Sequence, residues 1–542
     1  MKNKKSVRSP KSEVRSPEAQ PDALIDISSN EKTADCGLRT SDCRVCAVIT
    51  EETVASARDA IRRAATVADI IEIRLDCLRD LDFTKIDNLR LLVENKPLPT
   101  IITCRSVSEG GRQYVDDRAR LRLLVEGARR MADYCDIEAA HYEEAAKLAP
   151  DLSKLIVSYH NFIETPHDLE SIYEQITRLP AAIHKIATRA NAVSDSLRIF
   201  RLLERARREG KTLIALAMSE AGLMTRILGP SFGSLLTYAS LERGRESAPS
   251  QITCKELIDT YRIHKITRAT NITGIIGCPV SHSASPAMHN RAFAALGLDF
   301  VYLPIEVDDA ARFITQFVRP ATSEIELNLR GLSVTIPHKT AVMPLLDEID
   351  DTARKVGAVN TIVLDGEKLA GFNTDVAGAI APLEKMCPLG DESVAVIGAG
   401  GAARAVVYGL IERGARVTLF ARDVMKARAL AESFDVSAFP LDALASSDAQ
   451  IIINTTPVGM RGHSCGESPI AREWLRGRTL AYDLIYNPLE TQFLKDARAE
   501  GCAVLSGLEM LVAQAALQFR LWTGQDAPTD LMREAALKKI VA

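Results

Sequence analysis

Eight short apolar runs recur at intervals of roughly 25–30 residues between Cys43 and Ser240, and few folds fit this spacing. The runs are Arg44–Ile49, Ile70–Leu75, Thr100–Cys104, Tyr134–Ile137, Leu155–Tyr159, Ile183–Ala187, Leu213–Met218 and Leu235–Ala239. Charged, alanine-rich segments of helical periodicity, such as Ala119–Ala132 and Ser194–Glu209, lie between most of them. Eight strands alternating with helices predict a (β/α)8 TIM barrel. A doubly wound open sheet stays as the alternative, because rhythm alone does not close a ring.

Polar side chains gather at the ends of these runs. The ends carry Glu72 with Arg74, Arg105 with Glu109, Glu138, His160, Lys185, and Met218 with Ser219. In a barrel, chemistry collects at the carboxyl ends of the strands. One ionisable residue at a strand end is usually a salt bridge or a solvated rim, but six such ends out of eight predict an active site.

Lys185 is the single amine in a run that is typical of a buried strand. Its apolar neighbours make the charged ammonium costly, and a neutral amine can form a Schiff base with a ketone. His160, at the end of the preceding run, can transfer protons near neutral pH, and Glu109 is a candidate to orient its imidazole. The alternative is a buried lysine that merely pairs with Glu72.

The motifs around these residues resemble type I 3-dehydroquinate dehydratase. They are Glu72-Ile-Arg74-Leu-Asp76, Thr103-Cys-Arg105-Ser-Val-Ser-Glu109, Ser158-Tyr-His160, Lys185-Ile-Ala, Met218…Arg226 and Ser247-Ala-Pro-Ser-Gln251, and they cover about Cys43 to Gln251. The resemblance implies that Lys185 forms an imine with 3-dehydroquinate, that His160 is general base and then acid, and that Glu109 holds His160.

The same resemblance assigns the substrate contacts. It implies that Arg226 clamps the substrate carboxylate, a task that suits a planar bidentate donor. The residues that would grip the hydroxyls and close the site are Glu72, Arg74, Arg105, Ser247 and Gln251. Ser250 stands where the family usually has glycine, and we expect this departure to stiffen the closing loop.

A glycine-rich turn in the second half lies between a strand and a helix. After a linking helix expected over Glu256–Arg268, the segment Ile272–Gly277 opens a second α/β unit. The strand Ser393–Ile397 then leads into Gly398-Ala-Gly400-Gly401, with a small residue at Ala403 and a helix over Ala402–Arg413. This context predicts a Rossmann dinucleotide site, in which backbone amides approach a pyrophosphate at the helix N-terminus.

The next strand, Arg416–Ala421, should end near the adenosine ribose. An NAD site would present an acid there, whereas this chain offers Arg422 and, a helical turn later, Lys426. Two cations suit a 2′-phosphate, so NADP is the predicted cofactor. Asp423 keeps NAD as the alternative.

Lys339 and Asp375 are the candidate acid–base pair of the second half. Lys339 follows the extended segment Ser333–Ile336 and Pro337, and Asp375 lies in Gly371-Phe-Asn-Thr-Asp375. A facing lysine and aspartate could protonate an alkoxide as hydride arrives. The sequence cannot show that they meet, and each alone is more often a surface charge.

The motifs of this half resemble shikimate dehydrogenase from about Ile272 to the C-terminus. They are Ser281-His-Ser283, Ser333-Val-Thr335-Ile-Pro-His-Lys339, Asn360-Thr, Asn373-Thr-Asp375, Asn454-Thr455-Thr, Tyr486-Asn-Pro and Gly507-Leu-Glu-Met510-Leu-Val-Ala-Gln514. The resemblance implies that Lys339 and Asp375 are catalytic. It implies substrate contacts from Ser281, Ser283, Thr335, Asn360 and Gln514, and cofactor contacts from Gly398, Gly400, Gly401, Ala403, Arg422, Lys426, Thr455, Tyr486, Gly507 and Met510.

Two departures from the dehydrogenase family stand out. Ser333 replaces an asparagine that many bacterial members have. Ala421 replaces a common asparagine, which could weaken the grip on the 2′-phosphate.

These predictions divide the chain into a tail (1–42), a dehydratase barrel (43–258), a substrate-binding lobe (270–382), an NADP-binding domain (388–505) and C-terminal helices returning to the substrate lobe (506–542). The halves would make and consume the same compound, 3-dehydroshikimate, as in the bifunctional dehydratase–dehydrogenase family. The alternatives are a quinate dehydrogenase in the second half, an inactive ligand-binding scaffold, and a Schiff-base aldolase, which would not account for Arg226 and the Ser247–Gln251 motif.

Composition limits the classes of binding partner and the cellular compartment that fit this chain. The net charge of −4 gives no basic field for nucleic acid, and no apolar run approaches the roughly 18–20 residues that cross a bilayer. Eleven scattered cysteines favour reduced thiols and a cytoplasmic location, and we expect Cys43-Arg-Val-Cys46 to be two buried thiols rather than part of a metal site. The repeated Val-Arg-Ser-Pro tail predicts disorder, with a plastid transit peptide as the alternative. Small-molecule substrates are the expected partners.

Overall fold

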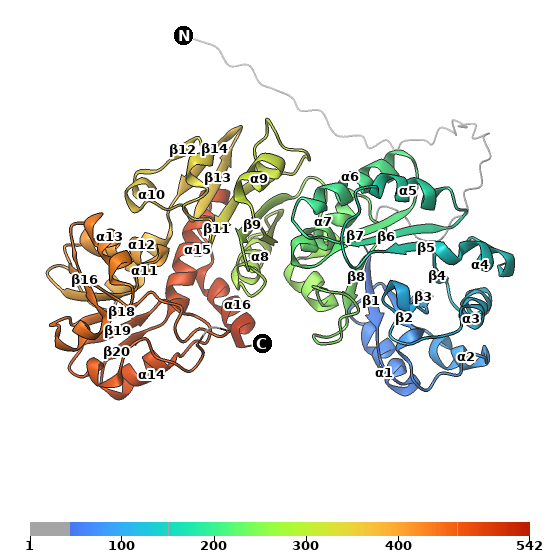
Figure 1. Ribbon diagram of the computed structural model, residues 1–542, viewed down its shortest axis with the longest axis horizontal. Helices are drawn as coiled ribbons and strands as arrows, with labels where there is room; N and C mark the ends of the chain where they lie inside the picture. Colours follow the sequence, from blue (N-terminus) through green and yellow to red (C-terminus); the bar gives the residue numbers. More distant parts are fainter. Residues whose placement is uncertain (1–43, 150, 463, 542) are drawn as a thin grey trace, which may run out of the picture. The chain divides into compact units, whose positions relative to one another are not determined.

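The first sheet of the computed structural model, which describes residues 44–149, 151–462 and 464–541, is an eight-stranded barrel (Figure 1). Its parallel strands are β1 (Val45–Ile49), β2 (Ile70–Arg74), β3 (Thr100–Thr103), β4 (Tyr134–Glu138), β5 (Leu155–His160), β6 (Ile183–Arg189), β7 (Leu213–Met218) and β8 (Thr237–Ser240). The order β7-β6-β5-β4-β3-β2-β1-β8 nearly closes the ring, and a bridge joins Leu213 to Ser234 just before β8. The predicted barrel is confirmed, and the open sheet is wrong.

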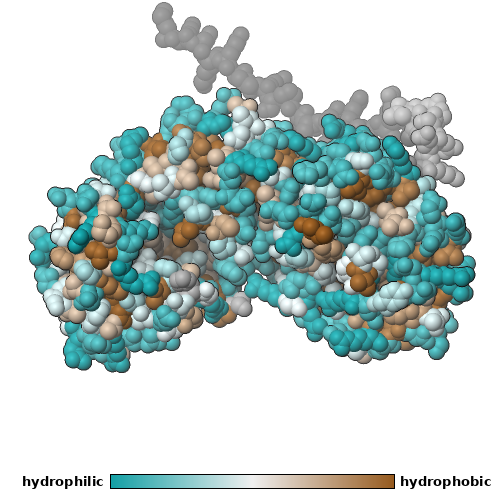
Figure 2. All heavy atoms as spheres, in the orientation of Figure 1, coloured by the Kyte–Doolittle hydropathy of each residue, from teal (hydrophilic) through white to brown (hydrophobic). Residues whose placement is uncertain are grey.

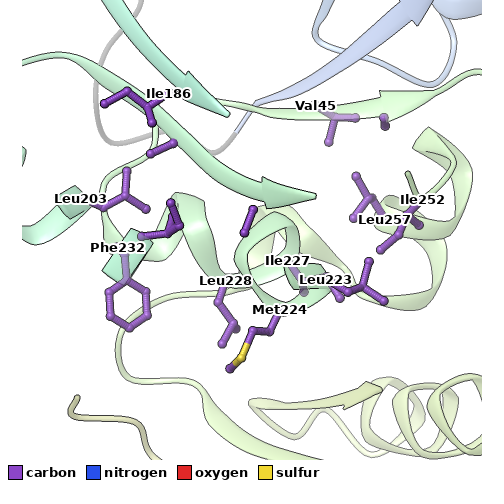
Figure 3. Close-up of a cluster of buried hydrophobic side chains, with 14 of the residues drawn as sticks. Val45, Ile186, Leu203, Leu223, Met224, Ile227, Leu228, Phe232, Ile252 and Leu257 are labelled. Atoms are coloured by element: carbon purple, nitrogen blue, oxygen red, sulfur yellow. The ribbon is translucent and has the colours of Figure 1, made fainter. Parts of the chain in front are cut away.

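Helices alternate with these strands. They are α1 (Val54–Ala64), α2 (Asp87–Val93), α3 (Asp117–Arg130), α4 (Tyr142–Leu148), α5 (Leu169–Thr177), α6 (Asp195–Arg208) and α7 (Leu223–Phe232). The strands are buried almost throughout, which explains their continuous apolar runs. Figure 3 shows Leu223, Met224, Ile227 and Leu228 of α7 in the buried cluster. This packing fixes α7, and with it the position of Arg226.

The second sheet is mixed and has six strands. They are β9 (Asn271–Gly277), β10 (Phe300–Glu306), β11 (Leu329–Val334), β12 (Glu348–Ile349), β13 (Thr361–Asp365) and β14 (Lys368–Phe372), in the order β10-β9-β11-β13-β14-β12. Its helices are α8 (Ser285–Ala295), α9 (Ala310–Phe313) and α10 (Asp351–Val356). The pairs of β13 with β11 and with β14 are antiparallel.

The third sheet is parallel and follows a Rossmann order. Its strands are β15 (Ser393–Ile397), β16 (Arg416–Ala421), β17 (Ser437–Pro440), β18 (Ile451–Asn454), β19 (Leu480–Asp483) and β20 (Ala503–Leu505). The spatial order β17-β16-β15-β18-β19-β20 reverses direction between β15 and β18, where dinucleotides bind in this fold. The predicted Rossmann fold is confirmed.

The remaining helices flank this sheet or join it to the second one. They are α11 (Asp375–Glu384), α12 (Gly401–Ile411), α13 (Val424–Glu432), α14 (Gln492–Ala499), α15 (Gly507–Thr523) and α16 (Thr529–Val541). Helix α15 packs against α11, and α16 packs against α8. The last helices of the chain therefore contact elements that come much earlier in the sequence.

The linking helix expected over Glu256–Arg268 is broken. A helical turn over Glu256–Thr260 is followed by a separate 3-10 turn over Ile263–Lys265. Arg262 between them has a φ of +52°, a left-handed conformation that a continuous right-handed helix cannot contain. The charged periodicity of this segment did not reveal the break.

One face of the molecule is mostly polar. Figure 2 shows hydrophilic residues over most of the face in view, with hydrophobic ones in separate groups. No helix among the described residues is both long enough and apolar enough to cross a membrane.

Gly331 on β11 allows α15 to approach the second sheet. A Cβ atom at this position would lie 2.0 Å from Trp522 Nε1 and 2.5 Å from the carbonyl oxygen of Ile362. These two atoms form a hydrogen bond of 3.1 Å that ties α15 to β13. A side chain at position 331 must therefore displace the indole.

We predict that Gly331→Ala destabilises the second half of the chain by about 1–3 kcal/mol, because the methyl group overpacks this contact. Urea unfolding followed by tryptophan fluorescence measures it, since both tryptophans, Trp474 and Trp522, lie in that half. Gly390→Ala is the matched control, because its Cβ would meet only the carbonyl oxygen of Arg413, at 3.9 Å. Equal unfolding midpoints for the two variants would contradict the prediction.

Candidate active sites

One cavity at the carboxyl ends of the barrel strands brings together all nine residues predicted for the first site. They are Glu72, Arg74, Arg105, Glu109, His160, Lys185, Arg226, Ser247 and Gln251. Glu72 and Arg74 lie on β2, His160 lies on β5 and Lys185 lies on β6. Arg226 lies on α7. The others come from the loops after β3 and β8. Phe162 and Tyr238 also line the cavity and were not predicted.

His160 and Glu109 form the expected pair. His160 Nδ1 lies 2.9 Å from Glu109 Oε2. Burial, and next the positive charges of Arg105 and Lys185, hold the pKa of His160 well below its ordinary value, so the imidazole is neutral. Burial also raises the pKa of Glu109 to about 7. A neutral imidazole that donates Nδ1–H to this carboxylate leaves Nε2 free to accept a proton.

The amine of Lys185 is buried, but its surroundings differ from the apolar pocket expected from the sequence. Nζ donates a hydrogen bond of 2.9 Å to Asp136 Oδ2 and lies 3.5 Å from Glu72 Oε1. It also lies 4.1 Å from the centre of the Tyr238 ring. Two carboxylates and an aromatic face all favour a positive charge on this nitrogen. The suggested pairing with Glu72 exists only as the longer of the two contacts.

Arg226 is a buried cation without an acidic partner among the described residues. Its side chain is 1% exposed, and its Nε and Nη2 have no hydrogen-bond partner there. Burial lowers the pKa of Arg226 to about 10, so the guanidinium stays charged at neutral pH. Such a group needs an anion, and it faces the cavity that also holds Lys185.

The other two arginines of the cavity are already paired. Arg74 donates to both oxygens of Asp76, at 2.9 and 2.8 Å. Arg105 lies 2.9 Å from Asp136 and 3.3 Å from Glu138. Their contribution to ligand binding therefore comes from atoms not used in these pairs.

The sequence-based assignment omitted Asp136. It lies two residues before Glu138 on β4, and residues two apart in a strand face the same side. Both acids are buried. The sequence signal that could have identified Asp136 is an acid inside an apolar run, two residues before the already predicted Glu138.

The loop after β8 closes on itself through two predicted residues. The backbone N–H and the hydroxyl of Ser247 donate to Gln251 Oε1 at 2.9 and 3.2 Å. Ser250 between them has a φ of +55°, a left-handed conformation that glycine adopts more easily. This explains why glycine suits the position.

Lys339 and Asp375 of the second half meet. Lys339 Nζ donates to Asp375 Oδ2 at 2.6 Å, and Asn360 Nδ2 donates to the other oxygen at 2.8 Å. Lys339 follows β11, and Asp375 begins α11, where the helix dipole favours a negative charge. The pairing that the spacing could not establish is thus present in the structure.

A chain of hydrogen bonds supports Asn360 from behind. Tyr302 donates to Ser333 Oγ at 2.7 Å, and Ser333 donates to Gln518 Oε1 at 2.8 Å. Gln518 Nε2 donates to Thr361 Oγ1 at 3.0 Å, and Thr361 donates to Asn360 Oδ1 at 2.8 Å. Sequence reasoning assigned no role to Tyr302, Gln518 or Thr361, which are buried and far apart in the chain.

The other predicted substrate contacts lie on three elements. Ser281 and Ser283 belong to the turn before α8, and Thr335 follows β11. The end of β9, which leads into this turn, lies close to Thr335: a Cβ on Gly277 would lie 2.3 Å from the Thr335 methyl group. Gln514 lies on α15 where this helix crosses α11 at Gly378.

A second cavity lies at the switch point of the Rossmann sheet. Five of the ten predicted cofactor residues line it, namely Gly398, Gly400, Arg422, Lys426 and Thr455. Gly398 has a φ of +111°, and a Cβ there would lie 2.7 Å from Thr455 Oγ1. Added Cβ atoms on Gly400 and Gly401 would meet no atom within 4 Å, which leaves room for a phosphate at the start of α12.

The charges beside this cavity bear on the choice of cofactor. Asp423 caps α13 by accepting the backbone N–H of Lys426 at 3.1 Å. Arg422 and Lys426 are exposed and make no ion pair within the described part of the chain. The acid that kept NAD as an alternative is therefore engaged in capping, while two cations are free.

The remaining cofactor residues lie outside the cavity. Ala403 is buried in the core of the sheet. Gly507 begins α15, where a Cβ would lie 2.1 Å from the carbonyl oxygen of Leu484, so its role in the fold is close packing. Met510 and Tyr486 pack against different core clusters on either side of this junction.

The Cys43-Arg-Val-Cys46 motif is only partly described. Cys43 lies outside the described residues, and Cys46 is a buried free thiol. Among the residues that the structure covers, no cluster of acids, cysteines and histidines could hold a metal.

Family models match along most of the chain. The model described as type I 3-dehydroquinase matches residues 45–268. Models described as shikimate dehydrogenase substrate binding domain, shikimate / quinate 5-dehydrogenase and shikimate 5'-dehydrogenase C-terminal domain match residues 275–362, 382–458 and 507–537. A protein of Arabidopsis thaliana named bifunctional 3-dehydroquinate dehydratase/shikimate dehydrogenase, chloroplastic, is 38% identical over 490 residues, which cover 86% of this chain and 79% of that protein. The chain belongs to this bifunctional family.

Other relatives match one half or both. The shikimate dehydrogenase (NADP(+)) of Pelobacter propionicus is 44% identical over 279 residues, covering 50% of this chain and 97% of that one. A solved structure of the dehydroquinate dehydratase and shikimate dehydrogenase of S. pombe is 26% identical, covers 92% of this chain and 98% of that one, and has a TM-score of 0.42. The solved structure of the shikimate 5-dehydrogenase of Thermus thermophilus, in complex with NADP(H) and shikimate, is 38% identical. It covers 50% of this chain and 100% of that one, with a TM-score of 0.46. Both family resemblances inferred from the motifs are confirmed.

We predict that the dehydratase half loses activity as the pH falls through about 7, because burial raises the pKa of Glu109 to about 7. Protonated Glu109 donates to His160 Nδ1, which moves the imidazole proton to Nε2 and removes the base. The measurement is the pH dependence of kcat/KM. In Glu109→Gln the side-chain oxygen can still accept from Nδ1 but does not titrate, so this acid limb should disappear. An unchanged limb in that variant would contradict the assignment.

Proposed function

We propose that residues 43–258 dehydrate 3-dehydroquinate to 3-dehydroshikimate through a Schiff base on Lys185. Residues 270–542 then reduce this product to shikimate with NADPH. One observation carries the first half of the proposal: the unpaired guanidinium of Arg226 lines the same cavity as an amine and a neutral imidazole. A cyclic ketone that bears a carboxylate would satisfy all three groups.

The dehydration follows from these three groups. The ammonium of Lys185 gives up one proton, and the resulting free amine adds to the ketone carbon. That proton leaves with the ketone oxygen as water, which gives an iminium that withdraws electrons from the adjacent carbon. His160 Nε2 takes the proton from that carbon and returns it to the departing hydroxyl, which leaves as water. Arg226 holds the carboxylate throughout, and hydrolysis of the iminium releases the product and the amine.

The reduction relies on Lys339 and Asp375. Dinucleotide bound at the Rossmann cavity would supply the hydride. Lys339 holds a proton at the ketone oxygen and neutralises the charge that develops there. Asp375 fixes the ammonium at 2.6 Å, and Asn360 fixes the carboxylate. The pair thus favours the alkoxide-like transition state over the bound ketone.

NADP is the proposed cofactor of this chain. Arg422 and Lys426 are free to bind a 2′-phosphate, whereas Asp423 is engaged in capping α13. Relatives at 40–45% identity are named shikimate dehydrogenase (NADP(+)). Ala421, the departure noted beside this site, lines the cavity next to Arg422.

We infer a cytoplasmic location for the protein. The nine described cysteines are all free, as expected in a reducing compartment. The relative from Arabidopsis thaliana is named as chloroplastic, which makes plastid import the alternative to test by fusing the N-terminal segment to a fluorescent protein. The tail expected to be disordered lies outside the described residues.

We predict that borohydride traps a covalent adduct on Lys185 when 3-dehydroquinate is present, because reduction converts the iminium to a stable secondary amine. Peptide mass spectrometry identifies the modified lysine. Lys154→Ala is the control, since Lys154 is in the same barrel and donates only to the backbone carbonyls of Ala128 and Ala132. Active protein that gives no adduct would exclude the imine mechanism.

We predict that Lys339→Ala abolishes the NADPH-linked reduction of 3-dehydroshikimate and leaves dehydration intact, because the two sites use separate residues. Spectrophotometric assays of the two steps on the same preparation measure this. Lys355→Ala is the control, because this lysine is exposed on α10 and touches neither site. Loss of both activities in folded Lys339→Ala would show that the sites are not independent.

A further inference from the structure

The carboxylate of Asp136 is the nearest group to the reactive nitrogen of Lys185. Oδ2 accepts from Lys185 Nζ at 2.9 Å and from Arg105 Nη2 at 2.9 Å. Oδ1 accepts from Ser158 Oγ at 2.6 Å. The carboxylate is 1% exposed and is thus fixed from three sides.

Other groups face the amine, but none takes this position. The charged or titratable ones are Glu72 on β2, Arg105 after β3, His160 on β5, Tyr238 on β8 and Cys46 on β1. Glu72 is 3.5 Å away, and its near oxygen accepts from Thr103 Oγ1 at 2.8 Å. Tyr238 presents its ring rather than its hydroxyl. Asp136 therefore makes the only direct hydrogen bond to Nζ within the described residues.

We propose that Asp136 is a positioning residue, the counter-ion that holds the nitrogen of Lys185 both as the resting ammonium and as the iminium. The proposal rests on the Schiff-base function given above and deepens it. No motif singled out from the sequence assigns Asp136 a role.

The balance of the reaction supports a constant counter-ion. In the net reaction, an ammonium and a ketone give an iminium and water, because the proton that the ammonium loses before the amine adds leaves with the ketone oxygen as water. The nitrogen therefore carries one positive charge and at least one N–H both at rest and as the iminium. A fixed carboxylate at 2.9 Å can accept that N–H in both states without moving. Because the iminium keeps a single N–H, a fixed acceptor also selects one of the two isomers about the C=N bond.

Asp136 is suited to this role and not to proton transfer. Burial alone would raise its pKa, but the positive charges of Arg105 and Lys185 hold the pKa of Asp136 well below its usual range. It therefore stays a carboxylate while His160 transfers the protons.

The test compares Asp136→Asn with Ser158→Ala in the full-length protein. Borohydride trapping with 3-dehydroquinate is measured over a series of pH values, together with kcat for dehydration. Asparagine removes the charge, so the ammonium loses its proton more readily and the midpoint of adduct formation moves down by about one to three pH units. The iminium also loses its counter-ion, so kcat falls. Ser158→Ala removes a donor to the same carboxylate but keeps the charge, so its midpoint stays at the wild-type pH.

Two further measurements separate this role from a structural one. NADPH-linked reduction by the same preparation reports that the rest of the chain is folded. Asp136→Glu keeps the charge and should restore the wild-type midpoint, even if kcat falls. An Asp136→Asn midpoint at the wild-type pH, or an equal shift in Ser158→Ala, would overturn the counter-ion role. Absence of any adduct in active wild-type protein would instead overturn the Schiff-base function.

Discussion

Ion pairing of buried charges is the constraint on which the barrel site depends. A buried ion costs several kcal/mol unless an opposite charge and hydrogen bonds compensate it. Arg74 and Arg105 meet this condition through Asp76 and Asp136, within hydrogen-bond distance. Arg226 does not meet it, because it has no acidic partner within the described residues, and we propose that a ligand compensates its charge. The same electrostatics thus separates the two arginines that already have acidic partners from the one that we propose binds the charge of a ligand.

The second half compensates a buried carboxylate with one ion pair and a chain of neutral groups. The carboxylate that we propose is catalytic, Asp375, pairs with Lys339 on one side and accepts from Asn360 on the other. Behind Asn360, each donor in the chain from Tyr302 through Ser333 points toward Asp375. Such a chain leaves each amide one orientation, because a flipped amide would place two donors or two acceptors together. It fixes the carboxylate without placing further charges in the interior.

Sequence periodicity was sufficient to predict the strands but not the side-chain contacts between them. The run Leu213–Met218 coincides with β7, because a strand buried on both faces must be apolar throughout. Lys339 and Asp375 could not be paired from their spacing, since 36 residues and three strands separate them. For Asp136, the spacing from Glu138 places both acids on one face of β4, but the contact with Arg105 comes from a different element and could not be predicted from that spacing. The break at Arg262 depends on a local backbone conformation that charge periodicity does not encode.

The three departures from the families differ in what they change. Ser250 adopts a left-handed φ of +55°, which costs a residue other than glycine about 1 kcal/mol. Ser333 has no such cost, because one hydroxyl both accepts from Tyr302 and donates to Gln518. A serine therefore keeps the chain to Asp375 continuous where many relatives use an amide. Ala421 removes a polar side chain beside Arg422, so binding of a 2′-phosphate must rely more on the two cations. Of the three, only the change at Ser250 acts on the backbone, and it does so in the loop that Ser247 and Gln251 close.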